Sequence, residues 1–352
     1  MCRFLSFSEW ANVWKALPEE QREAYWHPRF GDASGRWEKA RPECLLLESD
    51  TGQMLYPFLH HPIAGYEEIG TNLFDVQTAY GYGGPLFSGA WTDPEKRVAL
   101  RGVGDSLARH GVVAEFIRCH TEWTDQQLLS DCGYTVIRVR TNVECALVDR
   151  TGGEFINSWA AIGRRNLRIA RKAGLRHRVG DSQEDWTNFA RLYAITYKRI
   201  GMAPSYEFNL DYFRELATLP PHNVALILVE APHITEPVAS GIVLFGKRVA
   251  YYHLGASDLT HRRYRPNDFL YWAMAYEALQ RGCERIVWGG GLSSDLEDTL
   301  FRFKTHFGSV QKPVFIAGRV FDKERYESLC AEWARRNPER VSTIKMFLRY
   351  RA

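Results

Sequence analysis

Apolar and polar residues follow two rhythms along this chain, one typical of strands and the other of helices. Strand-like runs lie at 43–49, 53–63, 112–120 and 134–149. Helical spacing is found at 8–26, where Ser8 is the predicted N-cap, and at 93–111, which ends at a glycine. The first half of the chain therefore predicts an α/β unit.

The second half repeats this order of elements. Helical patterns lie at 155–173, 183–201, 211–220 and 267–282, and strand patterns lie at 223–231, 237–257 and 283–291. In both halves a strand, a turn and a strand are followed by a helix and a strand, which predicts an internal duplication. We place the boundary near 150–153, in the segment "DRTGGE".

Composition adds limits to this picture. The 352 residues suit about two domains, and 45% hydrophobic with 25% charged residues is ordinary for a soluble protein. No apolar run approaches the length of a membrane span, and no signal peptide is recognised. The seven cysteines are scattered without a C-x-x-C pair, which is typical of reduced thiols in a cytoplasmic protein.

The net charge of +3 does not by itself indicate a nucleic-acid-binding protein, but the helix at 155–173 carries a concentrated basic face. No acidic residue occurs between Glu154 and Asp181. The face comprises Arg164, Arg165, Arg168, Arg171 and Lys172. Such a face is either an ordinary solvated one or the contact for a phosphate-rich partner, such as tRNA or a nucleotide-linked substrate.

A second basic group, "HRRYRPNDF" at 261–269, surrounds Tyr264 with Arg262, Arg263 and Arg265. Arginine forks match phosphates and a tyrosine can stack on a base. The alternative is an exposed loop without a ligand.

Three further segments contain candidate chemistry. "TAYGYGGPLF" at 78–87 is either a turn or the rim of a site, because its glycines permit close approach of the backbone. "AYYHLGASD" at 250–258 offers His253 as a general base, although a lone histidine at a strand end is more often structural. In "LFRFKTHFG" at 300–308, Lys304 lies between phenylalanines and could hold an oxyanion or a phosphate, or else be a surface lysine.

Several common motifs are missing from the sequence. There is no phosphate-binding P-loop, no dinucleotide fingerprint, no nucleophile elbow and no metal-binding His/Cys cluster. The glycines at 289–291 follow a predicted strand, but no strong helix start follows them.

Taken in order, "AYGYGGP", "RRNLRIARKAG", "YYHLGAS", "NDFLYWAMAYEALQRGCERIVWGG" and "LFRFKTHFG" resemble the FemAB-related (FemABX-like) aminoacyltransferases within the N-acetyltransferase (GNAT) superfamily. The resemblance covers residues 40–310. It implies an α/β fold of two tandem GNAT-like domains, 1–150 and 151–352, with mixed sheets flanked by helices and a C-terminal tail that packs on the first domain. It also implies a cleft between the domains for the acceptor.

The resemblance also implies roles for individual residues. Lys304 would lie beside the reacting carbonyl, with Phe303 lining the site. We add Tyr252, since Tyr251 and Tyr252 point to opposite faces of a strand and only one of them can face a site. The loop rim would consist of Tyr80, Gly81, Tyr82, Gly83 and Gly84. The candidates for the general base that removes the amine proton are His253, His120 and Glu122.

The sequence therefore predicts an aminoacyl-tRNA-dependent N-aminoacyltransferase. It would act without cofactor or metal, as a cytoplasmic monomer. The acceptor would be an amine of a peptidoglycan precursor, a peptide or an amino-sugar natural product. Cell-wall members of the family often carry a long coiled-coil arm, and the absence of that pattern here weakens the cell-wall assignment.

Two alternatives remain. The first is a GNAT-type N-acyltransferase that uses acetyl-CoA or an acyl carrier protein. It is disfavoured because "HRRYRPND" lacks the glycines of a pyrophosphate-binding turn and "RGVGDS" at 101–106 lies inside a helical pattern. The second is a non-catalytic RNA-binding module, against which the two-domain α/β layout argues.

Overall fold

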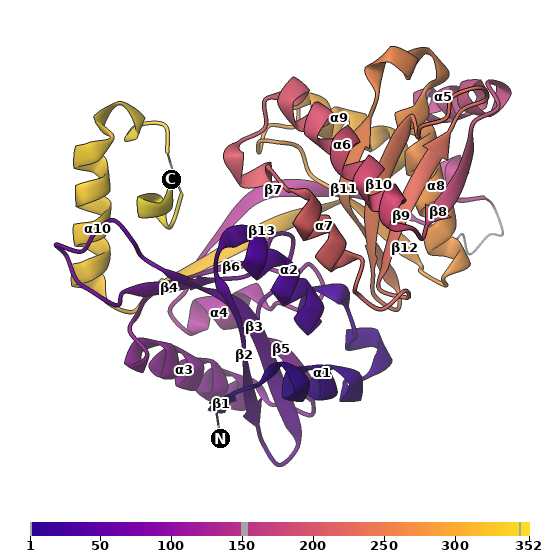
Figure 1. Ribbon diagram of the computed structural model, residues 1–352. Coiled ribbons are helices and arrows are strands. Elements are labelled where there is room, and N and C mark those ends of the chain that lie inside the picture. The colour runs from indigo at the N-terminus through magenta and orange to yellow at the C-terminus, as the bar shows by residue number, and fades with distance from the viewer. Residues whose placement is uncertain (1, 149–153, 345) are drawn as a thin grey trace. The chain divides into compact units, whose positions relative to one another are not determined.

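The computed structural model describes residues 2–148, 154–344 and 346–352 (Figure 1). The chain divides into two compact units that are each discontinuous in sequence. The first comprises Met1–Leu17, Ser34–Arg138 and Phe315–Ala352, and the second comprises Pro18–Ala33 and Val139–Val314. The boundary predicted near 150–153 falls outside the described residues. The C-terminal segment belongs to the first unit.

The first unit is built on a mixed sheet. Its strands are β1 (Cys2–Phe4), β2 (Arg41–Glu48), β3 (Gly52–Pro62), β4 (Phe74–Gln77), β6 (Val112–Arg118) and the later part of β13 (Val310–Val320), in that spatial order, with β5 (Leu86–Gly89) pairing with β3. All of these neighbours are antiparallel except β4 and β6, which are parallel. Its helices are α1 (Phe7–Ala16), α3 (Asp93–Arg109), α4 (Gln126–Asp131) and α10 (Lys323–Arg336), and α2 (Pro28–Glu38) ends in it.

Local sequence explains the helix ends in this unit. The N-cap of α1 is Ser6 rather than Ser8, because Ser6 and Glu9 form a capping box. The helix ends at Ala16, well before the predicted residue 26, since the residue before Pro18 is driven to extended backbone and Leu17 has ψ 152°. The predicted helix at 93–111 is confirmed as α3, which a second capping box begins.

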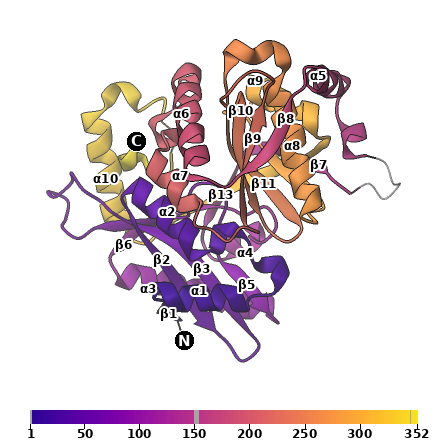
Figure 2. The ribbon, with the colours of Figure 1, turned by 45° about the vertical axis from the view of Figure 1, so that its right-hand side comes forward.

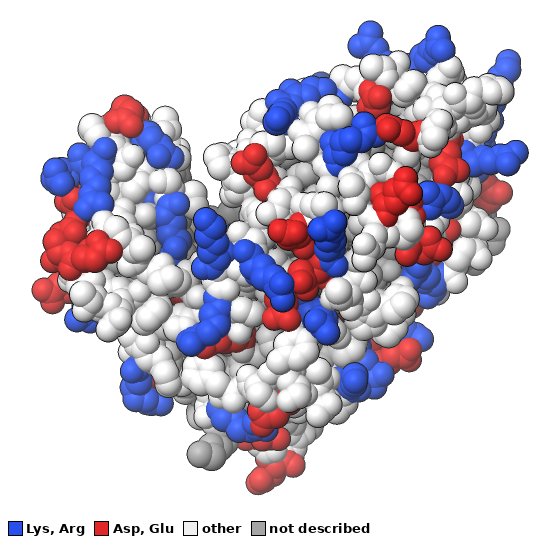
Figure 3. Space-filling model, in the orientation of Figure 1, with Lys and Arg blue, Asp and Glu red and all other residues white. Residues whose placement is uncertain are grey.

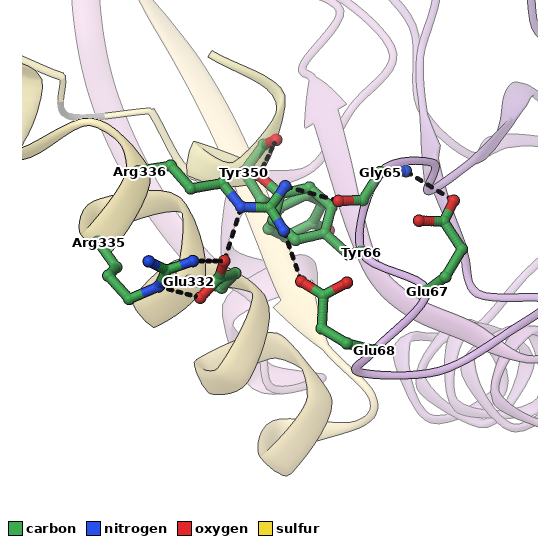
Figure 4. A network of polar contacts seen from close by, with 8 residues as sticks. All are labelled: Gly65, Tyr66, Glu67, Glu68, Glu332, Arg335, Arg336 and Tyr350. Atoms are coloured by element: carbon green, nitrogen blue, oxygen red, sulfur yellow. Dashed lines mark hydrogen bonds and ion pairs between the residues drawn. The ribbon is translucent and has the colours of Figure 1, made fainter.

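The C-terminal segment is attached to the rest of the first unit by polar contacts (Figure 4). Arg336 on α10 donates to the carbonyl oxygen of Gly65 at 2.6 Å and pairs with Glu68 and Glu332. The Tyr66 hydroxyl donates to the carbonyl oxygen of Tyr350 at 3.1 Å. The contacts of Arg336 with Gly65 and of Tyr66 with Tyr350 join residues 271 and 284 positions apart.

The second unit contains the other strands, again in a mixed arrangement. Its strands, in spatial order, are β7 (Thr135–Ala146), β12 (Arg285–Gly289), β11 (Val249–Ser257), β10 (Ala239–Phe245), β9 (Val224–Glu230) and β8 (Arg176–Gly180). Only β11 and β12 are parallel. Its helices are α5 (Ala161–Lys172), α6 (Gln183–Ile200), α7 (Leu210–Leu216), α8 (Pro266–Gln280) and α9 (Thr299–Lys304). Figure 2 shows α6 and α7 on one side of β9–β11, and α5 and α8 on the other.

Two irregularities occur in β11. Its register with β10 shifts between Ile242 and Val243, so that His253 is the extra residue of a β-bulge. Its parallel pairing with β12 covers only Val249–Tyr251, although β11 continues to Ser257. The two strands therefore part after Tyr251.

None of the helices in the described residues combines the length and apolar character needed to cross a membrane. No group of His, Cys, Asp and Glu among them is arranged to hold a metal ion. All seven cysteines are unpaired, and five of them are buried.

Candidate active site

Lys304 ends α9 and lies buried inside the second unit, with 6% of its surface exposed. Its ammonium group donates to the carbonyl oxygen of Gly290 at 2.8 Å and lies 5.3 Å from the centre of the Tyr252 ring. A lysine ammonium has three donors, and this hydrogen bond and this cation–π contact do not satisfy all of them. Lys304 can therefore interact with a further oxygen atom.

The electrostatic surroundings of Lys304 lack a compensating acid in contact. Burial, together with the nearby Arg140, lowers the pKa of Lys304 to about 7, and Asp298 acts in the opposite direction. Among the described residues, Arg140 has no ion-pair partner. A buried lysine beside an unpaired arginine makes this site favourable for negative charge.

A glycine turn after β12 provides the space around this lysine. Gly289 has φ +78°, and a side chain there would approach Nζ of Lys304 to 3.2 Å. A side chain at Gly290 would meet the Thr141 carbonyl oxygen at 2.7 Å. Only glycine fits both positions, so the turn brings a backbone carbonyl within reach of the ammonium group.

Asp298 fixes the other end of this turn. One carboxylate oxygen accepts from the amides of Leu300 and Phe301 and thereby caps α9, and the other accepts from the amides of Leu292 and Ser293. The residues directly after the glycines contain no strong helix start. The N-cap of α9 is Asp298, seven positions after Gly291.

Tyr252 and Tyr271 form the aromatic part of the site. Their rings stack at 5.4 Å, and burial raises the pKa of Tyr252 to about 12, with a hydrogen bond from Tyr271 opposing it. Phe303 packs edge-on against Tyr271 at 5.4 Å. The predicted residues Lys304, Tyr252 and Phe303 thus surround one cluster, with Tyr271 and Arg140 as members that the sequence did not reveal.

His253 lies in different surroundings from its neighbour Tyr252. Its Nε2 is 2.7 Å from the Tyr212 hydroxyl, and its ring contacts Phe30 and Phe208. Burial lowers its pKa to about 3. These contacts place His253 toward α7, whereas Tyr252 faces α8. A general base at His253 stays a prediction, and its surroundings favour a neutral core histidine.

The loop 78–84 belongs to the first unit and is firmly held. The Gly83 amide donates to the Arg118 carbonyl oxygen at 2.8 Å, and the Thr124 hydroxyl donates to the Gly83 carbonyl oxygen at 2.8 Å. Gly81 and Gly84 have φ of +111° and +117°, which requires glycine there. Tyr80 and Tyr82 remain half-buried at its surface.

His120 is fully buried beneath this loop. Its amide donates to the Gly83 carbonyl oxygen at 2.9 Å, and its Nδ1 accepts from the Glu122 amide at 3.2 Å. The Tyr82 ring lies 5.9 Å from its ring. Its backbone and its Nδ1 therefore organise the turn, and a proton-transfer role for His120 stays a prediction.

The predicted basic group lies mostly in a short 3₁₀ helix, Leu259–Tyr264, which Arg265 connects to α8. Arg265 has φ +57° and is the N-cap of α8 without a side-chain capping bond, and Pro266 follows it. Arg262, Arg263 and Arg265 are exposed, and Arg263 stacks on the Tyr264 ring at 4.7 Å. The start of a 15-residue helix next to three arginines is a favourable position for a phosphate.

The predicted basic helix is shorter than expected, since α5 begins at Ala161 after a 3₁₀ turn at Phe155–Ser158. Four of its predicted cations are exposed, namely Arg165, Arg168, Arg171 and Lys172. Arg164 is different, because it donates to the Trp159 carbonyl oxygen and stabilises the start of the helix. Figure 3 shows basic side chains projecting at the upper right, where Figure 1 places α5.

The comparisons with known proteins agree with this architecture. Residues 161–305 match the model of the "Acetyltransferase (GNAT) domain" family. The crystal structure of FemX has a TM-score of 0.72 with 14% identity, covering 93% of this chain and 99% of that one. No curated protein matches the sequence.

Two further structures are similar. The C-terminal domain of a putative lysylphosphatidylglycerol synthetase from Agrobacterium fabrum has a TM-score of 0.55 with 11% identity, covering 94% of this chain and 98% of that one. L-PGS from Bacillus licheniformis has a TM-score of 0.54 with 14% identity, covering 88% and 91%. These likenesses show the fold. The predicted FemABX-like fold is confirmed, and residues 161–305 match the GNAT domain family.

Proposed function

We propose that this FemX-like chain with a GNAT domain is an aminoacyl-tRNA-dependent N-aminoacyltransferase. The observation that carries the proposal is the buried, incompletely satisfied ammonium group of Lys304 beside the unpaired Arg140. Acyl transfer from an ester to an amine passes through a tetrahedral intermediate with a negative oxygen. A dry site with unpaired positive charge favours that intermediate over the neutral ester.

In this reaction the acceptor amine attacks the ester carbonyl, a C–N bond forms and the ester C–O bond breaks. The proton lost by the amine ends on the ribose hydroxyl that leaves. An ester is already activated, so the protein needs to orient two substrates and stabilise the oxyanion. Lys304 in its charged form would donate to that oxyanion, and Phe303 and Tyr252 would exclude water around it.

The donor would enter along the opened edge of β11. The end of the β11–β12 pairing after Tyr251 supports this, because backbone groups of β11 beyond it would then be free to bind the acyl group. The start of α8 with Arg262, Arg263 and Arg265 would bind a phosphate near the 3′ end of the tRNA. The exposed cations of α5 would contact the tRNA farther along, as would suit a polyanionic donor.

The acceptor would carry an amine, on a peptidoglycan precursor, a peptide or an amino sugar. The loop 78–84 is the proposed acceptor contact, because Tyr80 and Tyr82 stand on a backbone held rigidly by Gly83 and Gly84. We propose that the protein works as a cytoplasmic monomer.

A second candidate is an N-acyltransferase that uses acetyl-CoA or an acyl carrier protein. The match of residues 161–305 to an acetyltransferase family favours it. The same α8 start would then bind the pyrophosphate of CoA. Against it, the turn before α8 contains no glycine, so side chains limit the approach of a pyrophosphate to the backbone amides.

The deciding experiment offers both donors to the purified protein. Labelled aminoacyl-tRNAs, with and without RNase treatment, and labelled acetyl-CoA are incubated with an extract of amine-bearing molecules. Label that reaches an amine only from intact aminoacyl-tRNA is the expected result. Transfer from acetyl-CoA alone would overturn the tRNA-dependent proposal in favour of the second candidate.

A further inference from the structure

A polar group near the start of α8 takes no part in the site around Lys304. The Asp268 carboxylate, 5% exposed, accepts a hydrogen bond from the side-chain amide of Asn166 on α5 at 2.8 Å. His306, which follows α9, contributes an imidazole whose buried Nδ1 has no hydrogen-bond partner. These three side chains come from three separate segments of the second unit.

The Asp268 carboxylate forms no ion pair in the described part of the chain. Among the residues that the structure describes, Asp268 has no cation within ion-pair distance. Burial raises its pKa, and Asn166, Arg265, His306 and its own backbone amide in the first turn of α8 act in the opposite direction. A buried carboxylate without a cationic partner is expensive to keep, and it marks a position where an incoming cation gains free energy.

The position of Asp268 along α8 relates it to the proposed donor site. Arg265 caps the helix, Asp268 lies one turn later and Tyr271 lies one turn beyond that. Tyr271 stacks on Tyr252, whose ring contacts the ammonium group of Lys304. Along α8, Asp268 therefore stands between Arg265, at the proposed phosphate contact, and Tyr271, in the cluster of aromatic residues around Lys304.

We infer that Asp268, held by Asn166, binds the α-ammonium group of the aminoacyl donor. This inference rests on the proposed function. An aminoacyl ester carries this cation one carbon away from its carbonyl group, whereas an acetyl group carries none. A buried carboxylate at this position would select aminoacyl donors over simple acyl donors. The selectivity would come from desolvation, because an uncharged acyl group leaves the carboxylate unpaired.

Two non-reactive probes test this inference. One is adenosine with an aminoacyl group in amide linkage at its 3′ position, and the other is the same molecule with its α-amine acetylated. Binding of both is measured by calorimetry to the wild-type protein and to Asp268→Asn, which nearly preserves shape. Asp211→Asn is the matched control, since Asp211 lies on α7 with its side chain 80% exposed.

We expect the wild-type protein and Asp211→Asn to bind the free-amine probe at least about 30-fold more tightly than the acetylated one. Asp268→Asn should reduce this ratio to about threefold or less, mainly by losing affinity for the free amine. Equal binding of the two probes by the wild-type protein would overturn the inference, and that result does not depend on any variant folding.

The outcomes separate the inference from the proposed function. A wild-type preference that persists in Asp268→Asn would place the ammonium contact elsewhere and overturn the assignment to Asp268. If Asp268→Asn does not fold, Asn166→Ala replaces it, because loss of the orienting amide should also reduce the ratio. Binding of acetyl-CoA with no binding of either probe would overturn the proposed function together with the inference.

Discussion

Glu115 in the first unit and Lys304 in the second are both buried ionisable side chains, but their surroundings differ. The two carboxylate oxygens of Glu115 accept from the hydroxyls of Tyr56 and Tyr134, and Arg319 lies opposite it on β13. Lys304 has one carbonyl oxygen and the face of a tyrosine ring, with another cation nearby.

This difference separates a structural group from a chemical one. The partners of Glu115 saturate it, so the network can hold strands β3, β6 and β13 in one arrangement without any ligand. Lys304 is left with unused donors and a pKa lowered to about 7 by burial. Perturbed groups with unused hydrogen-bonding capacity are the ones that substrates can complete.

The largest effect expected on stability is that of Glu115→Ala. The substitution leaves two buried tyrosine hydroxyls without their shared acceptor and removes the negative charge that interacts with Arg319. We expect the free energy of unfolding in urea to fall by about 3–5 kcal/mol, while transfer per folded molecule is unchanged. Glu324→Gln on the exposed side of α10 is the control, and a loss below about 1 kcal/mol at Glu115 would refute the structural role.

Next in size is a pH effect on stability at Lys304. Because burial lowers the folded pKa of Lys304 from 10.5 to about 7, the unfolded chain binds more protons between these values. Burying the charged form of Lys304 lowers the free energy of unfolding by its full amount below pH 7, and this destabilisation decreases as the pH rises toward 10.5. Relative to Lys304→Met, the wild-type protein should gain up to about 1.4 kcal/mol per pH unit there. Parallel curves would show that Lys304 is not desolvated.

A smaller effect is expected at His253. Replacement by Phe removes the buried hydrogen bond between His253 and the Tyr212 hydroxyl, which should cost about 1–3 kcal/mol of unfolding free energy. Turnover should stay within about threefold, since a core histidine takes no proton from the substrate. A loss of about 100-fold or more, typical of a removed general base, would instead restore the catalytic role predicted from the sequence.

The smallest effect is expected on the surface of α5. The double substitution Arg165→Ala/Arg168→Ala removes two exposed cations and should raise the KM for the tRNA donor a few-fold, with kcat unchanged. The dependence of KM on salt should also weaken, because fewer counterions are released. Lys198→Ala/Arg199→Ala on α6 is the control pair. Equal effects of both pairs would show general attraction and no defined tRNA contact.

The sequence predicted those features that depend on neighbouring residues. The strand and helix periods, the end of α3 near Gly111 and the glycine loop at 78–84 are all local, and Lys304 was found through the phenylalanines beside it. Features that join distant residues were missed. The partners of Glu115 lie 59 and 19 positions away, and Asn166 and Asp268 are 102 positions apart.

The helix limits show a second reason for errors. Ser8 and Ser6 are both good caps by composition, and only the Ser6–Glu9 pairing decides between them. No helix start is predicted after Gly289–Gly291, because the capping residue Asp298 comes only after a loop. A local search cannot weigh a capping residue that acts across such a loop.

The most direct test of the central claim is aminoacyl transfer by Lys304→Met, measured in a single turnover beside the wild-type protein. We expect binding of aminoacyl-tRNA to persist, the thermal midpoint to hold or rise and the transfer rate to fall about 100-fold or more. If the folded variant transfers the aminoacyl group at close to the wild-type rate, Lys304 does not stabilise the reaction and the account is wrong.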